Sequence, residues 1–355
     1  MHTLPSVTFD LWKRLTKARA TRITPDVILA MFIATHLLRN GLSFRKQEVI
    51  SCLPHLGKDA MRTNALVTLA VGDKFNAEFR QWFLPGWQEY CERNDLDLIV
   101  IDHPLDISVR ASQRNPSWQK CLTPSHPVVS QYEQVAWLDA DIRIRPDAPN
   151  IFDGIPTEKV AAVDEYATPS KEEFSRALDS LYADWDANGV RYVSNRTPRE
   201  FHGNFGLDCD FERVLQGGVF VFSPALHADV LSRVYDDYED KGDASWNFEM
   251  RPLSYEVQTA ELDHWLTPKF NMTWGLFTQI YYPFLNERPS KMERMLGSVL
   301  RFGQANQRAT CVNSAFHANY FLHFSGRSKD YRLLDPQIGV GRHVRKAVLP
   351  SRRAA

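Results

Sequence analysis

The stretch "QYEQVAWLDADIRIRPDAPNIFD", residues 131–153, decides the fold. Its apolar run from Val135 to Leu138 predicts a buried strand, and the prolines that follow end that strand. Asp139 and Asp141 come directly after the run, and as residues i and i+2 of an extended chain they project from the same face. Two carboxylates that close repel each other unless a cation or a proton lies between them. The stretch therefore predicts a charged site at the end of a buried strand.

The flanking sequence predicts the sheet to which this strand belongs. Residues 65–75, "ALVTLAVGDKF", form a β-branched run closed by glycine and aspartate, which is typical of a buried strand and its loop. Apolar residues at helical spacing over 75–94 and the run "LDLIVID" at 96–102 complete a β-α-β unit. Further strands are predicted at 160–166 and at 214–222. The alternation predicts an α/β fold with a central, mostly parallel sheet flanked by helices.

The remaining segments suggest the domain limits. Residues 1–60 predict a helical N-terminal extension, 61–335 a single catalytic domain, and 336–355 a basic tail that we expect to be disordered. The polar segment 104–125 is expected to run over the surface. Residues 252–266, "PLSYEVQTAELDHWL", are expected to form one helix.

Composition narrows the class of protein. The chain has 355 residues, of which 44% are hydrophobic and 12% aromatic, as in a globular protein. Its net charge of −1 provides no overall field for nucleic acid or an anionic membrane, so no nucleic-acid partner is expected. The apolar window 27–38 is shorter than the ~20 residues that cross a bilayer, and a packed or interfacial helix is expected there. Five scattered cysteines without a CxxC pair favour a cytoplasmic location, with peripheral membrane contact allowed.

The aspartate pair suits a divalent cation. Carboxylate oxygens are the ligands that Mg²⁺ and Mn²⁺ prefer, and such cations keep positions open that a substrate diphosphate can fill. A solvated strand end with two turn-forming aspartates is the plainer alternative. A phosphotransferase of the haloacid dehalogenase type is another, with Asp139 as nucleophile and Asp236 and Asp237 as its acidic pair. The β-α-β unit that precedes Asp139 makes this the weaker candidate.

Two later motifs carry further polar groups. In "LQGGVFVFSP", residues 215–224, Gly217 and Gly218 let the backbone approach a ligand, although a structural turn explains them as well. In "FLHFSGRSKDYR", residues 321–332, His323 on an aromatic strand is followed by Arg327 and Lys329. A lone histidine on an apolar strand is more often a core residue. The adjacent cations favour a site that combines a metal-capable imidazole with phosphate-binding charge.

Taken in order, the motifs at 67–75, 132–144, 215–224, 255–266 and 323–326 resemble nucleotide-sugar-dependent glycosyltransferases of the GT-A fold. The resemblance covers roughly residues 62–335 and is nearest to the galactosyl- and xylosyltransferase-like families that have an Asp-x-Asp motif and a late histidine. The His-x-x-Gly-x-x-Lys-Pro-Trp ending of glycogenin-like relatives is kept in the spacing of His323, Gly326 and Lys329. Its Pro-Trp is lost.

The resemblance implies a role for each matching residue. The opening strand and loop would bind the nucleotide of a UDP- or GDP-sugar, the Asp-x-Asp and the late histidine would hold manganese or magnesium, and the glycine-containing strand would border the donor sugar. An acidic helix would border the reacting centre, and the late glycine and cations would face the diphosphate. The nucleotide-binding residues would be Thr68, Ala70 and Asp73, and the metal ligands Asp139, Asp141 and His323. Gln216, Gly217 and Gly218 would border the donor sugar, and Glu256, Gln258 and Asp263 the reacting centre. Gly326, Arg327 and Lys329 would face the diphosphate.

The resemblance also implies the reaction. A sugar would move to a hydroxyl acceptor such as a glycan or glycolipid, with retention of configuration, since relatives with a late histidine ligand mostly retain. Glu256 and Asp263, seven residues apart on one predicted helix, are the candidate bases if the enzyme inverts. A sugar-phosphate nucleotidyltransferase of the same fold is a weaker alternative. Such enzymes normally have a glycine-rich loop with arginine and lysine right after the first strand, whereas "AVGDKFNAEF" has one glycine and one lysine. A nucleotide-sugar-binding protein without turnover is the non-enzymatic alternative.

Overall fold

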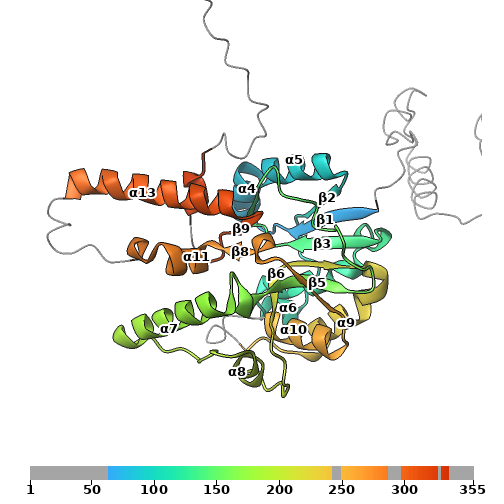
Figure 1. The fold of residues 1–355 in the computed structure, drawn as a ribbon. Helices are drawn as coiled ribbons and strands as arrows, with labels where there is room; N and C mark the ends of the chain where they lie inside the picture. Colours follow the sequence, from blue (N-terminus) through green and yellow to red (C-terminus); the bar gives the residue numbers. More distant parts are fainter. Residues whose placement is uncertain (1–62, 242–248, 287–296, 327–328, 336–355) are drawn as a thin grey trace, which may run out of the picture. The chain divides into compact units, whose positions relative to one another are not determined.

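The structure is a computed structural model that describes residues 63–241, 249–286, 297–326 and 329–335 (Figure 1). The chain divides into two compact units, residues 1–60 and 61–355. The helical extension predicted for 1–60, Arg327, and the tail predicted at 336–355 lie outside the described residues. The following concerns the second unit alone.

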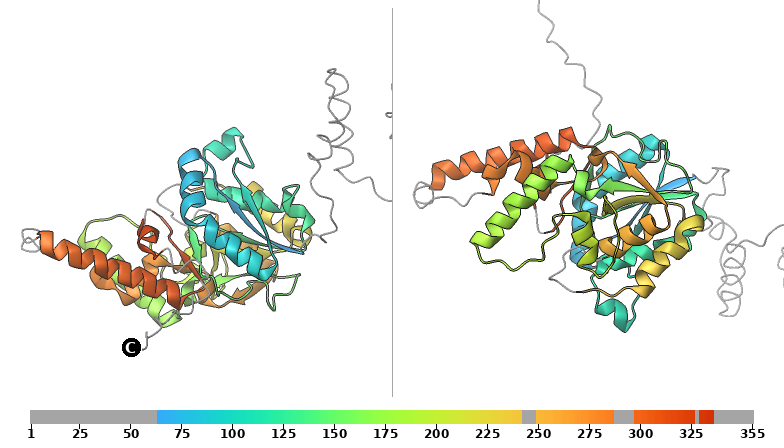
Figure 2. Two further views of the ribbon diagram at one scale, coloured as in Figure 1. Left: turned by 90° about the horizontal axis from the view of Figure 1, so that it is seen from above. Right: turned by 60° about the horizontal axis from the view of Figure 1, so that its bottom comes forward.

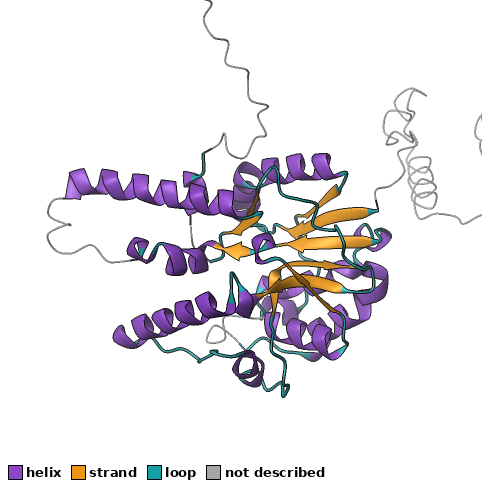
Figure 3. Cartoon of the chain, viewed as in Figure 1, coloured by secondary structure: helices purple, strands orange, loops and turns teal. Residues whose placement is uncertain are grey.

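A six-stranded sheet with the order β2-β1-β3-β6-β5-β7 forms the centre of this unit (Figure 3). Its strands are β1 Asn64–Leu69, β2 Asp97–Ile101, β3 Gln134–Leu138, β5 Val160–Asp164, β6 Leu215–Phe222 and β7 Asp263–Leu266. β6 runs antiparallel to its neighbours β3 and β5, whereas the pairs β1–β2, β1–β3 and β5–β7 are parallel. The predicted α/β class, with a mostly parallel central sheet between helices, is confirmed.

A second, three-stranded sheet has the order β4-β9-β8 and consists of β4 Ile142–Ile144, β8 Met272–Thr273 and β9 Phe321–His323. Its register places Ile142 opposite His323. β4 follows β3 after only three residues, so the Asp-x-Asp segment is the connection between the two sheets.

Helices cover both faces of the large sheet and extend beyond one end of it (Figures 1 and 2). They are α4 Asp73–Trp82, α5 Leu84–Asn94, α6 Val109–Ser112, α7 Lys171–Ala187, α8 Pro198–Gly203, α9 Pro224–Asp237, α10 Met250–Thr259, α11 Trp274–Tyr281 and α13 Gly297–Ala318, with a 3₁₀ segment η1 at Pro116–Ser125. α7, α11 and α13 lie together beyond the end of the sheet at which β1 and β3 terminate.

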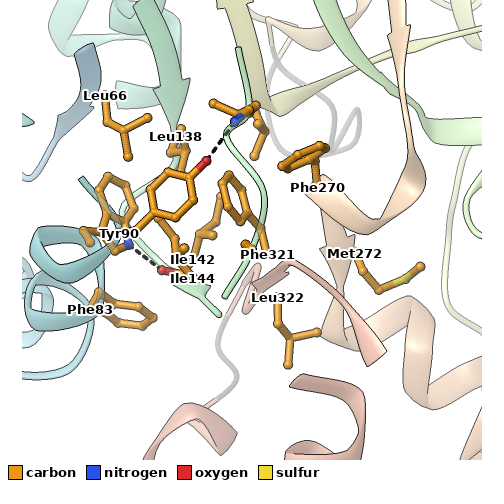
Figure 4. Close-up of a cluster of buried hydrophobic side chains, with 14 of the residues drawn as sticks. Leu66, Phe83, Tyr90, Leu138, Ile142, Ile144, Phe270, Met272, Phe321 and Leu322 are labelled. Carbon is orange, nitrogen blue, oxygen red and sulfur yellow. Dashed lines mark hydrogen bonds between the residues drawn. The ribbon is translucent and has the colours of Figure 1, made fainter. Parts of the chain in front are cut away.

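The continuous apolar runs of β1 and β3 are explained by cores on both faces. Leu66 and Leu138 point into a cluster with α4, α5 and the small sheet, where Trp87 Nε1 donates to Ile142 O at 2.7 Å and Tyr90 Oη accepts from the Ile151 amide at 2.8 Å (Figure 4). The alternate residues, such as Val67 and Trp137, point into a second cluster with η1, α9 and α10. Both strands therefore carry apolar side chains on both of their faces, as a sheet covered on both sides requires.

Two local predictions are wrong. The segment 104–125 does not stay on the surface, because η1 packs against α9 and buries Trp118 and Lys120, which are 0% and 2% exposed. The helix expected over 252–266 ends at Thr259, and Asp263 begins strand β7. Glu261 at φ 55° turns the chain between them. The shared helical face proposed for Glu256 and Asp263 therefore does not exist.

Candidate functional site

The two aspartates lie just beyond the end of β3. Asp139 donates its backbone amide to Gly218 O at 2.8 Å, which continues the β3–β6 ladder by one bond. Because the strand ends at Leu138, the two aspartates lie outside it, and the alternation of side chains along a strand does not decide where their carboxylates point. Asp141 instead starts the turn into β4, and its carbonyl accepts the amide of Phe324 at 3.0 Å. The convergence of the two carboxylates depends on the small sheet.

His323 is where the two carboxylates converge. Its Nε2 lies 3.1 Å from Asp141 Oδ1 and 3.9 Å from Asp139 Oδ2. The ring is only 4% exposed, because β9 holds it opposite Ile142 at the junction of the sheets. Three residues that are separated by almost two hundred positions in the chain therefore form one cluster. The small sheet brings together the three residues that the sequence predicts as metal ligands, and their role as ligands stays a prediction.

A chain of amides fixes the orientation of the imidazole. The Gly218 amide donates to Gln216 Oε1 at 2.6 Å, and the Asn271 side-chain amide donates to the same oxygen. Asn271 Oδ1 is then left to accept from His323 Nδ1, at 3.0 Å. With the proton on Nδ1, the Nε2 atom faces the carboxylates. Such outer partners fix which nitrogen of a histidine is free to act as a ligand.

Gly218 is required for this packing. A Cβ atom built on it would lie 2.6 Å from His323 Cε1 and 2.8 Å from Nδ1. A Cβ on the neighbouring Gly217 would meet only ordinary contacts, the nearest being Glu249 Oε1 at 3.4 Å. At Gly218 the missing side chain makes room for His323, a side chain of the protein itself. The sequence instead predicts that the backbone approaches a ligand there.

Lys120 and Glu249 belong to the cluster and were missed by the sequence analysis. Lys120 Nζ lies 3.0 Å from Asp139 Oδ1 and 2.7 Å from Glu249 Oε1, and it donates to Gly217 O at 2.9 Å. Trp137 Nε1 donates to the same oxygen of Asp139 at 2.8 Å. The only signal for Lys120 is its place between tryptophan and leucine in "WQKCL", which is too weak to separate a buried lysine from an exposed one. Glu249 carries no such signal.

The electrostatics of the cluster follow from burial and from these contacts. Burial raises the pKa of Asp139, and the charges of Lys120 and His323 offset that only in part. Burial acts on Asp141 too, but the charge and hydrogen bond of His323 outweigh it and lower the pKa of that carboxyl. Burial disfavours the charge on His323, yet Asp141 and Asp139 raise its pKa. Lys120 is thus a positive partner of Asp139, and His323 in its protonated form is a positive partner of Asp141.

The predicted nucleotide-binding segment lies beside the cluster. β1 is flanked by β2 on one side and β3 on the other, so the chain reverses its direction across the sheet between β1 and β3. Ligands of open α/β sheets bind at such a point, outside the carboxyl ends of the strands. Thr68 and Ala70 are buried there, and Asp73 begins α4 after Gly72 at φ 89°. Within the described residues, the Thr68 hydroxyl has no hydrogen-bond partner.

The late cations are only partly placed. Gly326 adopts φ 80°, which supplies the turn expected after β9. Lys329 pairs with Glu78 of α4 at 2.8 Å and is half exposed, so it stands over the helix that follows β1. Arg327 lies outside the described residues.

The three candidate catalytic residues have their contacts elsewhere. Glu256 pairs with Arg233 at 3.1 Å and accepts from Tyr238, while Gln258 donates to the carbonyls of Arg213 and Ser254. Asp263 accepts from Trp265 Nε1 at 2.8 Å on the edge strand β7. None of these contacts involves the aspartate cluster.

The donor set fits a hard divalent cation, although the side chains contact each other directly. Two carboxylates and an imidazole nitrogen are ligands that Mn²⁺ and Mg²⁺ accept. Among the described residues, no group of three or more such side chains stands ready to hold an ion. The reason is visible in the contacts: Lys120 and His323 already neutralise the carboxylates. A bound ion would require neutral His323, since metal and proton compete for one nitrogen.

Comparisons with known proteins bear on the fold. No protein-family model and no curated protein sequence matches the chain. One similar solved structure is a glycosyltransferase involved in glycosylation of the major capsid of PBCV-1, which is 12% identical in sequence. The match covers 76% of this chain and 98% of that chain, and its TM-score is 0.41. The galactosyltransferase LgtC, in complex with donor and acceptor sugar analogs, has 11% identity, 74% and 87% coverage and a TM-score of 0.40.

A third similar structure is the WbbM bifunctional glycosyltransferase, with 11% identity, 76% of this chain covered and a TM-score of 0.43; the chain spans 47% of WbbM. At these scores the likeness carries no argument, so the fold is described from the structure and the function has to follow from the site. In the described ranges no helix is both long enough and apolar enough to cross a bilayer.

Proposed function

We propose that the chain is a glycosyltransferase that moves a sugar from a nucleotide diphosphate sugar to a hydroxyl acceptor. The observation that carries this proposal is the convergence of Asp139, Asp141 and His323 beside the point at which the sheet reverses between β1 and β3. That point binds nucleotides in open α/β sheets, and the cluster supplies ligands for a cation on a diphosphate. The GT-A arrangement expected from the motifs is consistent with the observed sheet.

Each residue of the cluster has a role in the proposed reaction. Departure of the diphosphate develops negative charge, and a divalent ion, when bound by Asp139, Asp141 and His323, would stabilise that charge. Asn271 and Gln216 hold the imidazole so that Nε2 faces the carboxylates. Lys120 keeps Asp139 paired, and the N-terminus of α4 directs backbone amides toward the nucleotide side of the site. We further propose retention of configuration, with a UDP- or GDP-sugar as donor and a glycan or glycolipid as acceptor.

Thermal shift with UDP and GDP, with and without Mn²⁺, tests the proposal on the full chain. A ligand at one hundred times its Kd stabilises the folded state by about 2.7 kcal/mol, and we expect this only when both nucleotide and metal are present. Asp139→Asn and Asp141→Asn should abolish the shift while Asp147→Asn, which removes an exposed carboxylate paired with Arg145, should leave it unchanged. Nucleotide binding and turnover that persist in excess EDTA would refute metal dependence.

Two further assays separate the alternatives. Hydrolysis of a sugar nucleotide with manganese distinguishes an enzyme from a binding protein without turnover. Phosphatase activity toward an aryl phosphate would favour the haloacid dehalogenase type, although Asp139 Oδ1 is shared here between Lys120 and Trp137 and is poorly placed to attack. Proton NMR of the first product decides stereochemistry, because an α-linked donor gives an α-linked product under retention.

A further inference from the structure

A cavity of about 480 Å³ is lined by residues of α7 and α11, and none of the residues of the aspartate cluster lines it. Glu165, which follows β5, and Ser325, two residues after His323, are among its lining residues. Arg251, two residues after Glu249, lines it as well. The cavity is therefore tied to the cluster through two separate segments of chain. Its volume suits a sugar ring or a small glycoside.

The walls of the cavity are mostly apolar and aromatic, and the hydroxyls on them are already engaged. Tyr166 donates to Asn195 O at 2.7 Å, Tyr182 accepts from the Asn195 amide at 2.8 Å, and Tyr192 donates to Asp186 at 3.0 Å. Tyr182 and Tyr192 stack at 4.6 Å with an interplanar angle of 7°. The Arg196 guanidinium also lies over the Tyr182 ring at 4.9 Å. Aromatic side chains of this kind suit the apolar face of a sugar better than its hydroxyls.

Arg251 is the one basic side chain among the described residues that line the cavity, and Glu165 is the one acidic side chain. Arg251 is 1% exposed, donates to Phe201 O at 2.7 Å and to Asn195 Oδ1 at 3.1 Å, and lies over the Phe201 ring at 4.7 Å. Its Nε has no hydrogen-bond partner, and no carboxylate of the described residues pairs with its guanidinium. Burial lowers its pKa, as expected for a cation without a counter-charge.

Arg114 is a second buried arginine that has a counter-charge. It is 7% exposed and is paired with Glu239 at 3.0 Å, although its Nε, like that of Arg251, has no hydrogen-bond partner among the described residues. Arg251 lacks this compensation, although an unpaired buried charge is strongly disfavoured. A guanidinium presents a planar fork that matches carboxylate and phosphate oxygens. The missing counter-charge is therefore one that a ligand in the cavity can supply.

We propose that this cavity binds the acceptor and that the acceptor carries an anionic group, a carboxylate or a phosphate, which pairs with Arg251. That the ligand is the acceptor rests on the proposed function, and that it is anionic rests on Arg251. The aromatic faces hold the sugar ring, and the part of the cavity lined by Glu165 and Ser325 brings a hydroxyl toward the cluster. The chemistry selects acidic sugars or sugar phosphates over neutral sugars.

The test uses three glycosides that differ only at C6: methyl β-glucoside, methyl β-glucuronide and methyl β-glucoside 6-phosphate. Their Kd values are measured by ligand-observed NMR on the full chain with UDP and Mn²⁺. We expect at least one anionic glycoside to bind about tenfold or more tightly than the neutral one, as a charge-assisted pair implies. The stronger of the two identifies carboxylate or phosphate as the group. Equal affinity for all three, or binding of none, overturns the proposal.

Variants assign the preference to Arg251. Arg251→Met should abolish it, Arg251→Lys should keep part of it, and Arg233→Met, which removes a half-exposed arginine of α9, should leave it unchanged. A preference that survives in Arg251→Met overturns the proposal, and if that variant fails to fold, the wild-type discrimination decides alone. Metal-dependent binding of UDP and of GDP is measured on the same samples. Such binding without an anion preference refutes only this inference, and the absence of metal-dependent binding of both nucleotides refutes the proposed function.

Discussion

Gly218→Ala is the most discriminating change that the structure suggests. The new methyl group would lie 2.6 Å from His323 Cε1 and 2.8 Å from Nδ1, whereas the same change at Gly217 meets nothing closer than 3.4 Å. The imidazole cannot yield cheaply, because it is buried and held between Asn271 and Asp141 at 3.0 and 3.1 Å. The two glycines share one strand and one degree of burial, so each is the matched control of the other.

Overpacking of a buried site costs typically ~1–3 kcal/mol. For a domain of this size each kcal/mol corresponds to roughly 2–4 °C in Tm, so Gly218→Ala should melt lower by roughly 2–12 °C. Gly217→Ala should remain within about 1 kcal/mol of the wild type, since the loss of glycine's freedom in the unfolded chain favours it slightly. Displacement of His323 in Gly218→Ala should also weaken Mn²⁺-dependent nucleotide binding about tenfold or more.

A double-mutant cycle identifies the partner of the clash. In a His323→Ala background the ring is absent, and Gly218→Ala should lose most of its penalty, with only Gln216 Oε1 at 3.0 Å still close. Unfolding is followed by circular dichroism and nucleotide binding by calorimetry. Equal melting temperatures for the two alanine variants, or a Gly218→Ala penalty unchanged without His323, would refute the reasoning.

Two other perturbations test the charges of the site. Lys120→Met leaves the buried carboxylates of Asp139 and Glu249 without their cation and should destabilise the fold by about 3–5 kcal/mol in urea unfolding. Lys329→Met breaks an exposed pair and should cost about 1 kcal/mol or less. Similar losses of stability in the two variants would contradict the burial of the Lys120 charge. Burial raises the pKa of Glu165 from 4.5 to about 7, so the folded state binds more protons than the unfolded state between these values and stability falls as pH rises through them. Glu165→Gln should remove that fall and be more stable than the wild type at pH 8 by up to ~3 kcal/mol, and identical pH dependences in metal-free urea titrations would contradict the shift.

Much of the fold could be predicted from the sequence because its signals are local. The apolar runs at β1, β2, β3 and β6 predict buried strands, and the β-α-β order predicts the parallel arrangement of β1, β2 and β3. The antiparallel direction of β6 has no such local signal. Asp139 and Asp141 stand out because a charged pair after a buried run has few structural uses. The position of Asp263 could not be predicted, because the apolar spacing of 252–266 suits a helix and only the turn at Glu261 ends it.

The amino-acid sequence by itself determined strands β1, β2, β3, β5 and β6, the acidic pair and the presence of a late histidine, since each depends on neighbours within a few residues. Only the tertiary structure decided what these residues contact. Lys120 looked like part of a polar surface segment and is buried, because two distant carboxylates compensate its charge. Gly218 matters because His323, more than a hundred residues later, returns beside it. The guanidinium of Arg251 has no carboxylate partner among the described residues. Whether a charge has a counter-charge depends on its three-dimensional surroundings, which no local sequence pattern encodes.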